Sequence, residues 1–246
     1  HNVQYTGVKL SDLLRETGLK PKAKWVLAEG SDTSGMTRSI PIEKILDDCL
    51  IAWAMNGEAL RPEQGYPARL VVPGWEGNMW VKWIRRLEFG DKPYMTREET
   101  SKYTDLLTDG KARMFTWVME AKSVVTLPSP EKPILQKGIQ QLRGLAWSGK
   151  GKIKRVDVSL DGGKNWRTAQ LHAPIMSKSL VRFTLPFEWS GEELLIQSRA
   201  IDETGYVQPY IQELQKIRGK NSIYHNNSIA TWLVSKSGRV DNVRLG

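Results

Sequence analysis

The stretch QGYPARLVVPGWEGNMWVKWI, residues 64–84, determines the fold prediction for this chain. Its apolar run, residues 70–72, is short and rich in β-branched side chains, which predicts a buried strand. A Pro-Gly pair then ends the strand, and Gly77 allows a ligand to approach the backbone closely because glycine has no Cβ. Arg69 and Lys82 flank this turn, and three tryptophans accompany them. These residues suit either a cradle for a flat, anionic cofactor or a plain tryptophan core with solvated cations.

The segments on either side of this stretch alternate between short helices and strands. We expect a helix that begins with Ser11 as its N-cap and ends at Gly18, a strand at residues 24–29 and a short helix after Ser39. Further on, the sequence Thr-Arg-Glu-Glu at residues 96–99 has the form of a capping box and opens a short helical piece. This alternation predicts a mixed α+β domain.

The C-terminal half has an all-β pattern. Residues 153–161 alternate between apolar and polar side chains, a Gly-Gly turn follows, and residues 164–169 form the return strand. Further short strands at similar spacing predict an immunoglobulin-like sandwich. A Pro/Ser linker follows a strand near residue 115, so we predict two domains, residues 1–114 and 115–246.

Composition excludes several classes of protein. The chain has 246 residues and a formal charge of +9, but its cations are scattered and no nucleic-acid recognition module accompanies them. An anionic substrate or an acidic partner fits the charge better than nucleic acid. No apolar run is long enough to cross a membrane. The single Cys49 excludes an internal disulfide, and the three histidines lack metal-ligand spacing, so we predict no metal ligand in this chain.

Four further stretches resemble a known family. AWAMNGEAL at residues 52–60, together with residues 64–84, resembles the molybdopterin-binding segment of the sulfite oxidase family. WSGKGKIKRVDVSLDGGKNW at residues 147–166 and RAIDETGYVQP at residues 199–209 resemble the dimerisation domain of that family. TREETSKYTDLL, which begins at Thr96, is most like the molybdenum subunit of bacterial sulfane dehydrogenases. The resemblance implies a partial molybdopterin-binding domain followed by an immunoglobulin-like dimerisation domain.

The resemblance also implies roles for individual residues. Tyr103 corresponds to the active-site tyrosine, and Arg218 corresponds to the arginine that the second domain lends to the substrate pocket. Gln64 stands where sulfite oxidases have a histidine, which alters one cofactor contact. The residues expected to contact the pterin are Asp32, Gln64, Arg69, Trp80, Val81 and Lys82.

One element of the family pattern is not found. The family's molybdenum is bound by a cysteine that precedes the matched region, and Cys49 does not align with it, so we expect a fragment that is incomplete for catalysis. Cys49 itself has the pattern of a small buried hydrophobic residue.

For the intact protein, the resemblance implies a molybdenum-molybdopterin cofactor and oxidation of sulfite or a sulfane sulfur. It further implies electron transfer to a c-type cytochrome, assembly as a homodimer or as a heterotetramer with the cytochrome, and a periplasmic location. Two alternatives remain: a non-catalytic dimerisation or binding scaffold, and a molybdenum enzyme of the same family that acts on another oxyanion such as nitrate.

Overall fold

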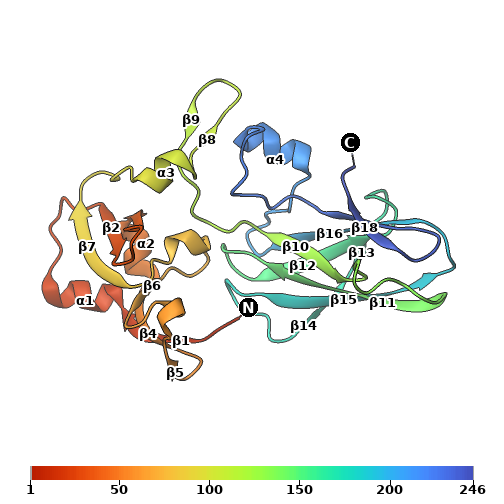
Figure 1. The fold of residues 1–246 in the computed structure, drawn as a ribbon, viewed down its shortest axis with the longest axis horizontal. Helices are drawn as coiled ribbons and strands as arrows, with labels where there is room; N and C mark the ends of the chain where they lie inside the picture. The colour runs from red at the N-terminus through yellow and green to blue at the C-terminus, as the bar shows by residue number, and fades with distance from the viewer. Residues whose placement is uncertain (1, 246) are drawn as a thin grey trace. The chain divides into compact units, whose positions relative to one another are not determined.

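The computed structural model describes residues 2–245 and divides the chain into two compact units, which are coloured from red to green and from green to blue in Figure 1. The division falls between Val118 and Met119, four residues beyond the expected boundary of 114 and 115. The reason is a group of aromatic side chains. The ring of Trp117 stacks on that of Trp75 at 5.2 Å between centroids, so this segment packs with the first unit.

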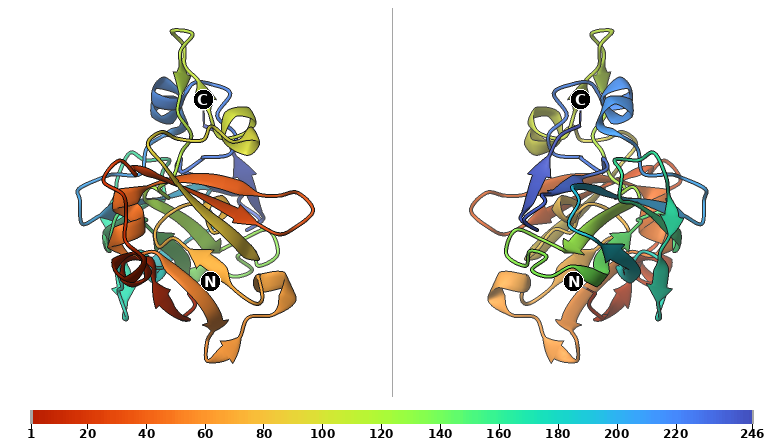
Figure 2. Two further views of the ribbon diagram at one scale, coloured as in Figure 1. Left: turned by 90° about the vertical axis from the view of Figure 1, so that its left-hand side faces the viewer. Right: turned by 90° about the vertical axis from the view of Figure 1, so that its right-hand side faces the viewer.

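The first unit contains three small sheets and three short helices. Its elements are β1 (Tyr5–Lys9), α1 (Leu10–Thr17), β2 (Trp25–Gly30), β3 (Thr37–Pro41), α2 (Ile42–Asp47), β4 (Leu50–Met55), β5 (Glu58–Ala59), η1 (Pro62–Gln64), β6 (Arg69–Val71), η2 (Gly77–Met79), β7 (Ile84–Gly90), α3 (Arg97–Ser101), β8 (Asp105–Leu106) and β9 (Ala112–Arg113). One sheet has the order β1-β4-β5 with β6 paired to β4, another has the order β3-β2-β7, and β8 pairs with β9. The β8–β9 hairpin projects from the rest of its unit in Figures 1 and 2. The predicted α+β class is confirmed.

Strand β6 is the centre of the predicted cofactor segment. It pairs antiparallel with β4, with Leu50 opposite Val71 and Ala52 opposite Arg69. Leu70, Val71 and Val72 are buried, as the apolar run predicted. Because β6 begins at residue 69, Arg69 lies in the strand itself and its side chain has a fixed starting direction.

The prediction for the first helix is wrong at one end. Helix α1 begins at Leu10 with Lys9 in the N-cap position, so Ser11 lies inside the first turn. Strand β1 runs directly into this helix and Leu10 is 1% exposed, so burial of the leucine sets the start. The helix ends at Gly18 as predicted, with φ of 80° and its N–H bonded to the Leu14 carbonyl.

The second unit is a two-layer sandwich, which confirms the immunoglobulin-like prediction. Its elements are β10 (Lys122–Leu127), β11 (Gly138–Trp147), β12 (Ile153–Ser159), β13 (Arg167–Thr168), β14 (Gln170–His172), β15 (Val181–Trp189), β16 (Leu194–Asp202), α4 (Ile211–Arg218), β17 (Thr231–Val234) and β18 (Val240–Val243). One sheet has the order β10-β11-β15-β14 and the other β13-β12-β16-β17-β18. Their inner faces bury side chains such as Leu142, Val156, Phe183 and Ile196 in one core.

Helix α4 corrects the all-β prediction for this half of the chain. Its sequence IQELQKIR buries Leu214 and Arg218, and the N–H of Tyr210 donates to the carboxylate of Glu213 at 3.1 Å. This Tyr-x-x-Glu arrangement gives the helix a defined start, and the helix carries Arg218 at its last position. None of the helices in residues 2–245 has the length and apolar character needed to cross a membrane.

Candidate functional site

A small pocket in the first unit brings together four of the six residues predicted to contact a cofactor. It has a volume of about 120 Å³ and is formed by the loop between β2 and β3 and by the segment from η2 to the start of β7. The residues that line it are Asp32, Met36, Gly77, Asn78, Trp80, Val81, Lys82 and Trp83. Residues about 50 positions apart in the chain therefore line one pocket, and Asp32, Trp80, Val81 and Lys82 are among them.

The Lys82 ammonium group is held at the edge of this pocket by two contacts. Its Nζ donates to the carbonyl of Glu63 at 2.9 Å and lies 4.3 Å from the centroid of the Trp83 ring. Trp83 has a φ of 50°, which is an unusual backbone conformation for a bulky residue, and its indole N–H donates to the Pro62 carbonyl at 2.8 Å. The indole and the carbonyl thus fix the lysine head group while its charge remains available to an anion.

Asp32 supplies an acceptor in the same pocket. The hydroxyl of Ser34 donates to its carboxylate, and the N–H of Met36 donates to Oδ1 at 3.2 Å. The hydrogen bond from Ser34 lowers the pKa of Asp32; burial opposes this change, and the Met36 N–H and the positive charge of Lys82 add to it. The carboxylate is therefore ionised at neutral pH and accepts hydrogen bonds from N–H donors such as those of a pterin ring.

Arg69 supports the wall of the pocket and does not line it. Its Nη1 donates to the carbonyl of Gln64 and its Nη2 to the carbonyl of Trp80, both at 3.0 Å. Burial lowers the pKa of Arg69, and the neighbouring Tyr5 opposes this effect. Its Nε is buried without a hydrogen-bond partner among the described residues. Arg69 therefore connects the segment of Gln64 to that of Trp80, and the side chain of Gln64 caps η1 by accepting from the Arg61 N–H at 3.0 Å.

Tyr103 lies elsewhere in the first unit, next to an arginine that the sequence analysis missed. The guanidinium carbon of Arg38 is 4.3 Å from the centroid of the Tyr103 ring, and its Nε donates to the carbonyl of Asn78 at 3.2 Å. Because Asn78 lines the pocket, Arg38 connects the tyrosine to the pocket wall. Arg38 is fully buried, and its Nη1 and Nη2 have no hydrogen-bond partner among residues 2–245. The sequence TRSI, residues 37–40, gave no signal for this role. An arginine in a short strand pattern of this kind looks the same as a solvent-exposed cation.

A buried glutamate fixes the turn that carries Tyr103. Glu99 is fully buried at the third position of α3, and its Oε2 accepts from the N–H of Thr96 at 3.0 Å, as the capping box predicted. The same carboxylate accepts from the N–H of Ser39 and from its hydroxyl, the latter at 2.9 Å. Glu99 therefore joins helix α3 to strand β3, which is also the strand of Arg38.

Replacement of Glu99 by alanine is expected to destabilise the first unit by about 3 kcal/mol. The substitution leaves the buried N–H of Ser39 without its acceptor, and an unsatisfied buried donor of this kind costs about 1–3 kcal/mol. The loss of the Thr96 cap adds about 1 kcal/mol. Denaturant unfolding monitored by tryptophan fluorescence measures the change. The exposed Glu63 provides the control, since Glu63→Ala removes a carboxylate for which no such role is seen; equal stability of the two variants would contradict the assignment.

Arg218 is the last residue of α4 in the second unit and is 2% exposed. Its Nη2 lies 3.3 Å from Oε2 of Glu120, so the predicted substrate arginine is paired with a carboxylate of its own unit. The sequence analysis missed Glu120, because nothing in the segment MFTWVMEAK distinguishes it from a surface glutamate.

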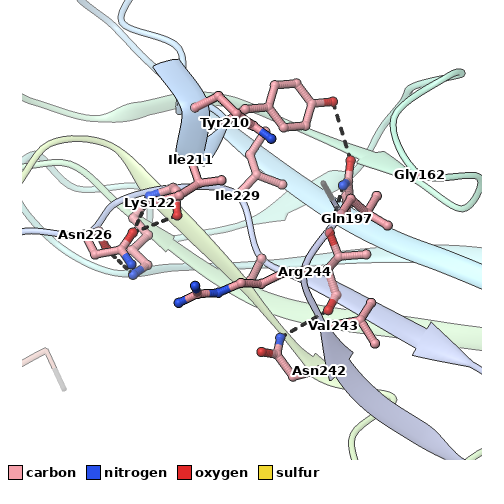
Figure 3. A pocket seen from close by; sticks show the side chains of 15 residues that line it. Lys122, Gly162, Gln197, Tyr210, Ile211, Asn226, Ile229, Asn242, Val243 and Arg244 are labelled. Atoms are coloured by element: carbon pink, nitrogen blue, oxygen red, sulfur yellow. Dashed lines mark hydrogen bonds between the residues drawn. The ribbon is translucent and has the colours of Figure 1, made fainter. Parts of the chain in front are cut away.

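A larger cavity in the second unit contains none of the predicted residues. It has a volume of about 490 Å³, and Figure 3 shows Lys122 and Arg244 on its walls. The hydroxyl of Tyr210 lies 3.5 Å from Oε1 of Gln197 at one side of the view. Arg218 does not line this cavity, so size alone does not indicate the predicted site. Within the described residues, no group of three or more His, Cys, Asp or Glu side chains is placed to hold a metal ion.

The chain thus consists of a mixed α+β domain, which has a small pocket lined by a cation and a carboxylate, and an immunoglobulin-like domain, an arrangement compatible with a cofactor-binding module. Family models agree with this class. The model described as oxidoreductase molybdopterin binding domain matches residues 1–98, and that described as Mo-co oxidoreductase dimerisation domain matches residues 113–232. The chain belongs to the sulfite oxidase family of molybdopterin oxidoreductases.

Similar proteins of known identity come from animals, plants and bacteria. The mitochondrial sulfite oxidase of Drosophila melanogaster is 32% identical over 89% of this chain and 43% of its own length. The sulfite oxidase of Gallus gallus is 32% identical over 84% of this chain and 50% of its own length. The NADH nitrate reductase of Solanum lycopersicum is 32% identical over 83% of this chain and 27% of its own length. The chain thus spans half or less of these relatives.

Among solved structures, the sulfane dehydrogenase SoxCD from Paracoccus pantotrophus is similar over the full length of this chain. The identity is 60% and the TM-score 0.96, and the match covers 64% of that chain. The predicted resemblance to the sulfane dehydrogenase type is therefore confirmed.

The lining of the pocket in the first unit suits part of a molybdopterin, the cofactor of this family. A pterin presents N–H donors and carries an anionic phosphate, and the pocket offers the ionised Asp32 and the cationic Lys82. A Cβ placed on Gly77 meets no atom within 4 Å, so this glycine leaves open space on the pocket wall. The buried Nε of Arg69, for which no partner is found among the described residues, is a further donor close to this wall. The residues present therefore suit the group that the family binds.

Proposed function

We propose that this chain forms most of the molybdenum subunit of an enzyme that oxidises a sulfur oxyanion or a sulfane sulfur. The observation that carries the proposal is the pocket of the first unit. In it, Asp32 and Lys82 face one small space within the region matched by the molybdopterin-binding model. The similarity to a sulfane dehydrogenase supports this substrate class.

The residues of the chain have separate tasks in this proposal. Lys82 binds an anionic group of the pterin by a charge-assisted hydrogen bond, and Asp32 accepts from its N–H donors. Arg69 keeps the carbonyls of Gln64 and Trp80 in place, and Trp80 and Val81 form the wall beside the lysine. Arg218 binds the anionic head of the substrate, and Tyr103 orients the reacting group through its hydroxyl. When bound, the cofactor supplies two-electron redox chemistry at sulfur.

An activity assay tests the proposal directly. The complete protein is expressed with its molybdenum cofactor, and reduction of cytochrome c is followed with sulfite and with thiosulfate as substrates. We expect turnover with one of these sulfur compounds and about one molybdenum per chain by mass spectrometry. A purified protein that contains molybdenum but oxidises neither compound would contradict the proposed substrate class. A native protein that contains no molybdenum would favour the scaffold alternative.

Substitution of Gly77 by valine is expected to remove the cofactor without destabilising the protein. The Cβ position of Gly77 contacts nothing within 4 Å, so the apoprotein accommodates the added methyl groups. The same atoms project into space that we assign to the pterin. Pterin fluorescence and molybdenum content report the cofactor, and thermal unfolding of the apoprotein reports stability. Full retention of the cofactor in Gly77→Val would show that the pterin does not approach this wall.

Partners and location complete the proposal. The match to a dimerisation domain supports an oligomer through the second unit. We propose a c-type cytochrome as the electron acceptor and the periplasm as the compartment, as in the exported relatives of the sulfane dehydrogenase type. Copurification of a haem protein with the tagged chain, and fractionation of the native cells, test these two points.

Nitrate reduction is the second candidate function. The plant nitrate reductase relative is as similar to this chain as the animal sulfite oxidases are, with 32% identity in each case. The direction of electron flow separates the two candidates, because a nitrate reductase takes electrons from a reduced donor such as methyl viologen. Nitrate-dependent oxidation of this donor without sulfite-dependent reduction of cytochrome c would favour nitrate.

A further inference from the structure

A partly buried carboxylate in the second unit is surrounded by polar groups from four separate segments. Glu120 lies just before β10, and its side chain is 17% exposed. Its Oε2 lies 3.3 Å from Nη2 of Arg218 and 3.2 Å from both Nε2 of His225 and the hydroxyl of Tyr206. Its Oε1 lies 3.6 Å from Nζ of Lys150. A single glutamate thus joins helix α4, the loop after α4, the β16–α4 loop and the β11–β12 loop.

Glu120 faces two cationic side chains. Arg218 and Lys150 both oppose its carboxylate, and the His225 ring lies beside the same oxygen as Arg218. Burial alone would raise the pKa of Glu120, but the hydrogen bond from His225 and the charges of Arg218, His225 and Lys150 lower it to about 2. Glu120 is therefore ionised at neutral pH.

This carboxylate holds the Arg218 side chain. Arginine has a long side chain with many rotamers, and an anionic partner restricts a guanidinium that is 2% exposed to one position. Helix α4 sets the position of the Cα of Arg218 at its last turn, and Glu120 contacts the guanidinium at Nη2. A guanidinium has five N–H donors, so a contact with one carboxylate is compatible with an oxyanion bound by other donors.

We infer that Glu120 is the positioning residue that holds Arg218 in the orientation for binding the anionic substrate. This inference rests on the proposed function of Arg218. Glu120 does not belong to the sequence pattern of the site. Its effect is on substrate affinity, and it takes no direct part in the chemical step.

The test uses the complete holoenzyme and the variants Glu120→Gln, Arg218→Met and Asp157→Asn. Glu120→Gln is isosteric and removes only the charge. Asp157→Asn is the matched control, because Asp157 is also buried in the second unit and pairs with Arg155 and Arg199. KM and kcat for sulfite are measured with cytochrome c, together with molybdenum content. Inhibition by sulfate at constant ionic strength gives a second measure of anion affinity.

We expect Glu120→Gln to raise the KM for sulfite and the inhibition constant of sulfate at least tenfold. The kcat should stay within threefold of the wild-type value, and molybdenum content should be unchanged. Asp157→Asn should leave KM unchanged. The double variant Glu120→Gln/Arg218→Met should bind no more weakly than Arg218→Met alone, because both substitutions remove the same interaction.

Other outcomes overturn distinct parts of the inference. An increased KM in Arg218→Met with a wild-type KM in Glu120→Gln would overturn the positioning role and leave the proposed function intact. A wild-type KM in both variants would instead remove Arg218 from the proposed site. Should Glu120→Gln not fold, Glu120→Asp keeps the charge and moves it by one methylene. In that variant a KM between those of the wild type and Arg218→Met supports the inference, and an unchanged KM overturns it.

Discussion

Replacement of Arg218 by methionine is expected to raise the KM of the complete enzyme for its anionic substrate, with a smaller effect on kcat. Removal of one member of a desolvated charge pair costs about 2–5 kcal/mol, which corresponds to roughly 30- to 5,000-fold in affinity. The expected loss is large because Arg218 is 2% exposed, so that water does not replace the lost guanidinium. Steady-state kinetics with sulfite and cytochrome c measure the change.

Two further variants make the result specific. Arg199 is a suitable control, since it also pairs with a carboxylate in the second unit and lies 4.2 Å from the Trp166 ring centroid. Arg199→Met should lower stability and leave KM unchanged. Arg218→Lys keeps the charge but loses the planar fork of donors, so its KM should fall between those of the wild type and Arg218→Met. Equal KM values for Arg218→Met and the wild type would exclude Arg218 from substrate binding.

Replacement of Lys82 by methionine is expected to lower the affinity for the pterin by roughly 10- to 150-fold. This range corresponds to about 1.5–3 kcal/mol for a hydrogen bond with a charged partner. The purified variant should therefore contain little molybdenum and little pterin. Mass spectrometry measures the metal, and fluorescence of the released pterin measures the organic part. Neither readout depends on turnover.

Lys44 provides a control in the same unit. Its Nζ donates to the Pro73 carbonyl at 2.8 Å and lies 5.7 Å from the Trp75 ring centroid, so a carbonyl and an indole hold it as they hold Lys82, and Asp48 is an additional partner. Lys44 does not line the pocket, and Lys44→Met should retain the cofactor. Loss of the cofactor from both variants to the same extent would indicate a general loss of stability and contradict the assigned role of Lys82.

Local patterns predicted much of the fold. The β-branched run at residues 70–72 and the alternation from residue 153 onward predicted strands, and both regions form strands because burial of one face follows directly from the pattern. The start of α1 was misplaced, since the burial of Leu10 outweighs the capping preference of Ser11. Helix α4 was missed because it is short and lies among strands.

The candidate site shows the same division between local pattern and tertiary contact. The sequence by itself determined the family, the cofactor class and the residues that the family motif names, because those residues lie in continuous segments such as residues 64–84. Only the tertiary structure decided that Lys82 lines the pocket whereas Arg69 braces its wall, since that depends on which carbonyls lie within reach of each cation. Arg38 and Glu120 emerged only from the structure. Their roles depend on burial beside residues 65 and 98 positions away, and no local pattern in a sequence encodes such contacts.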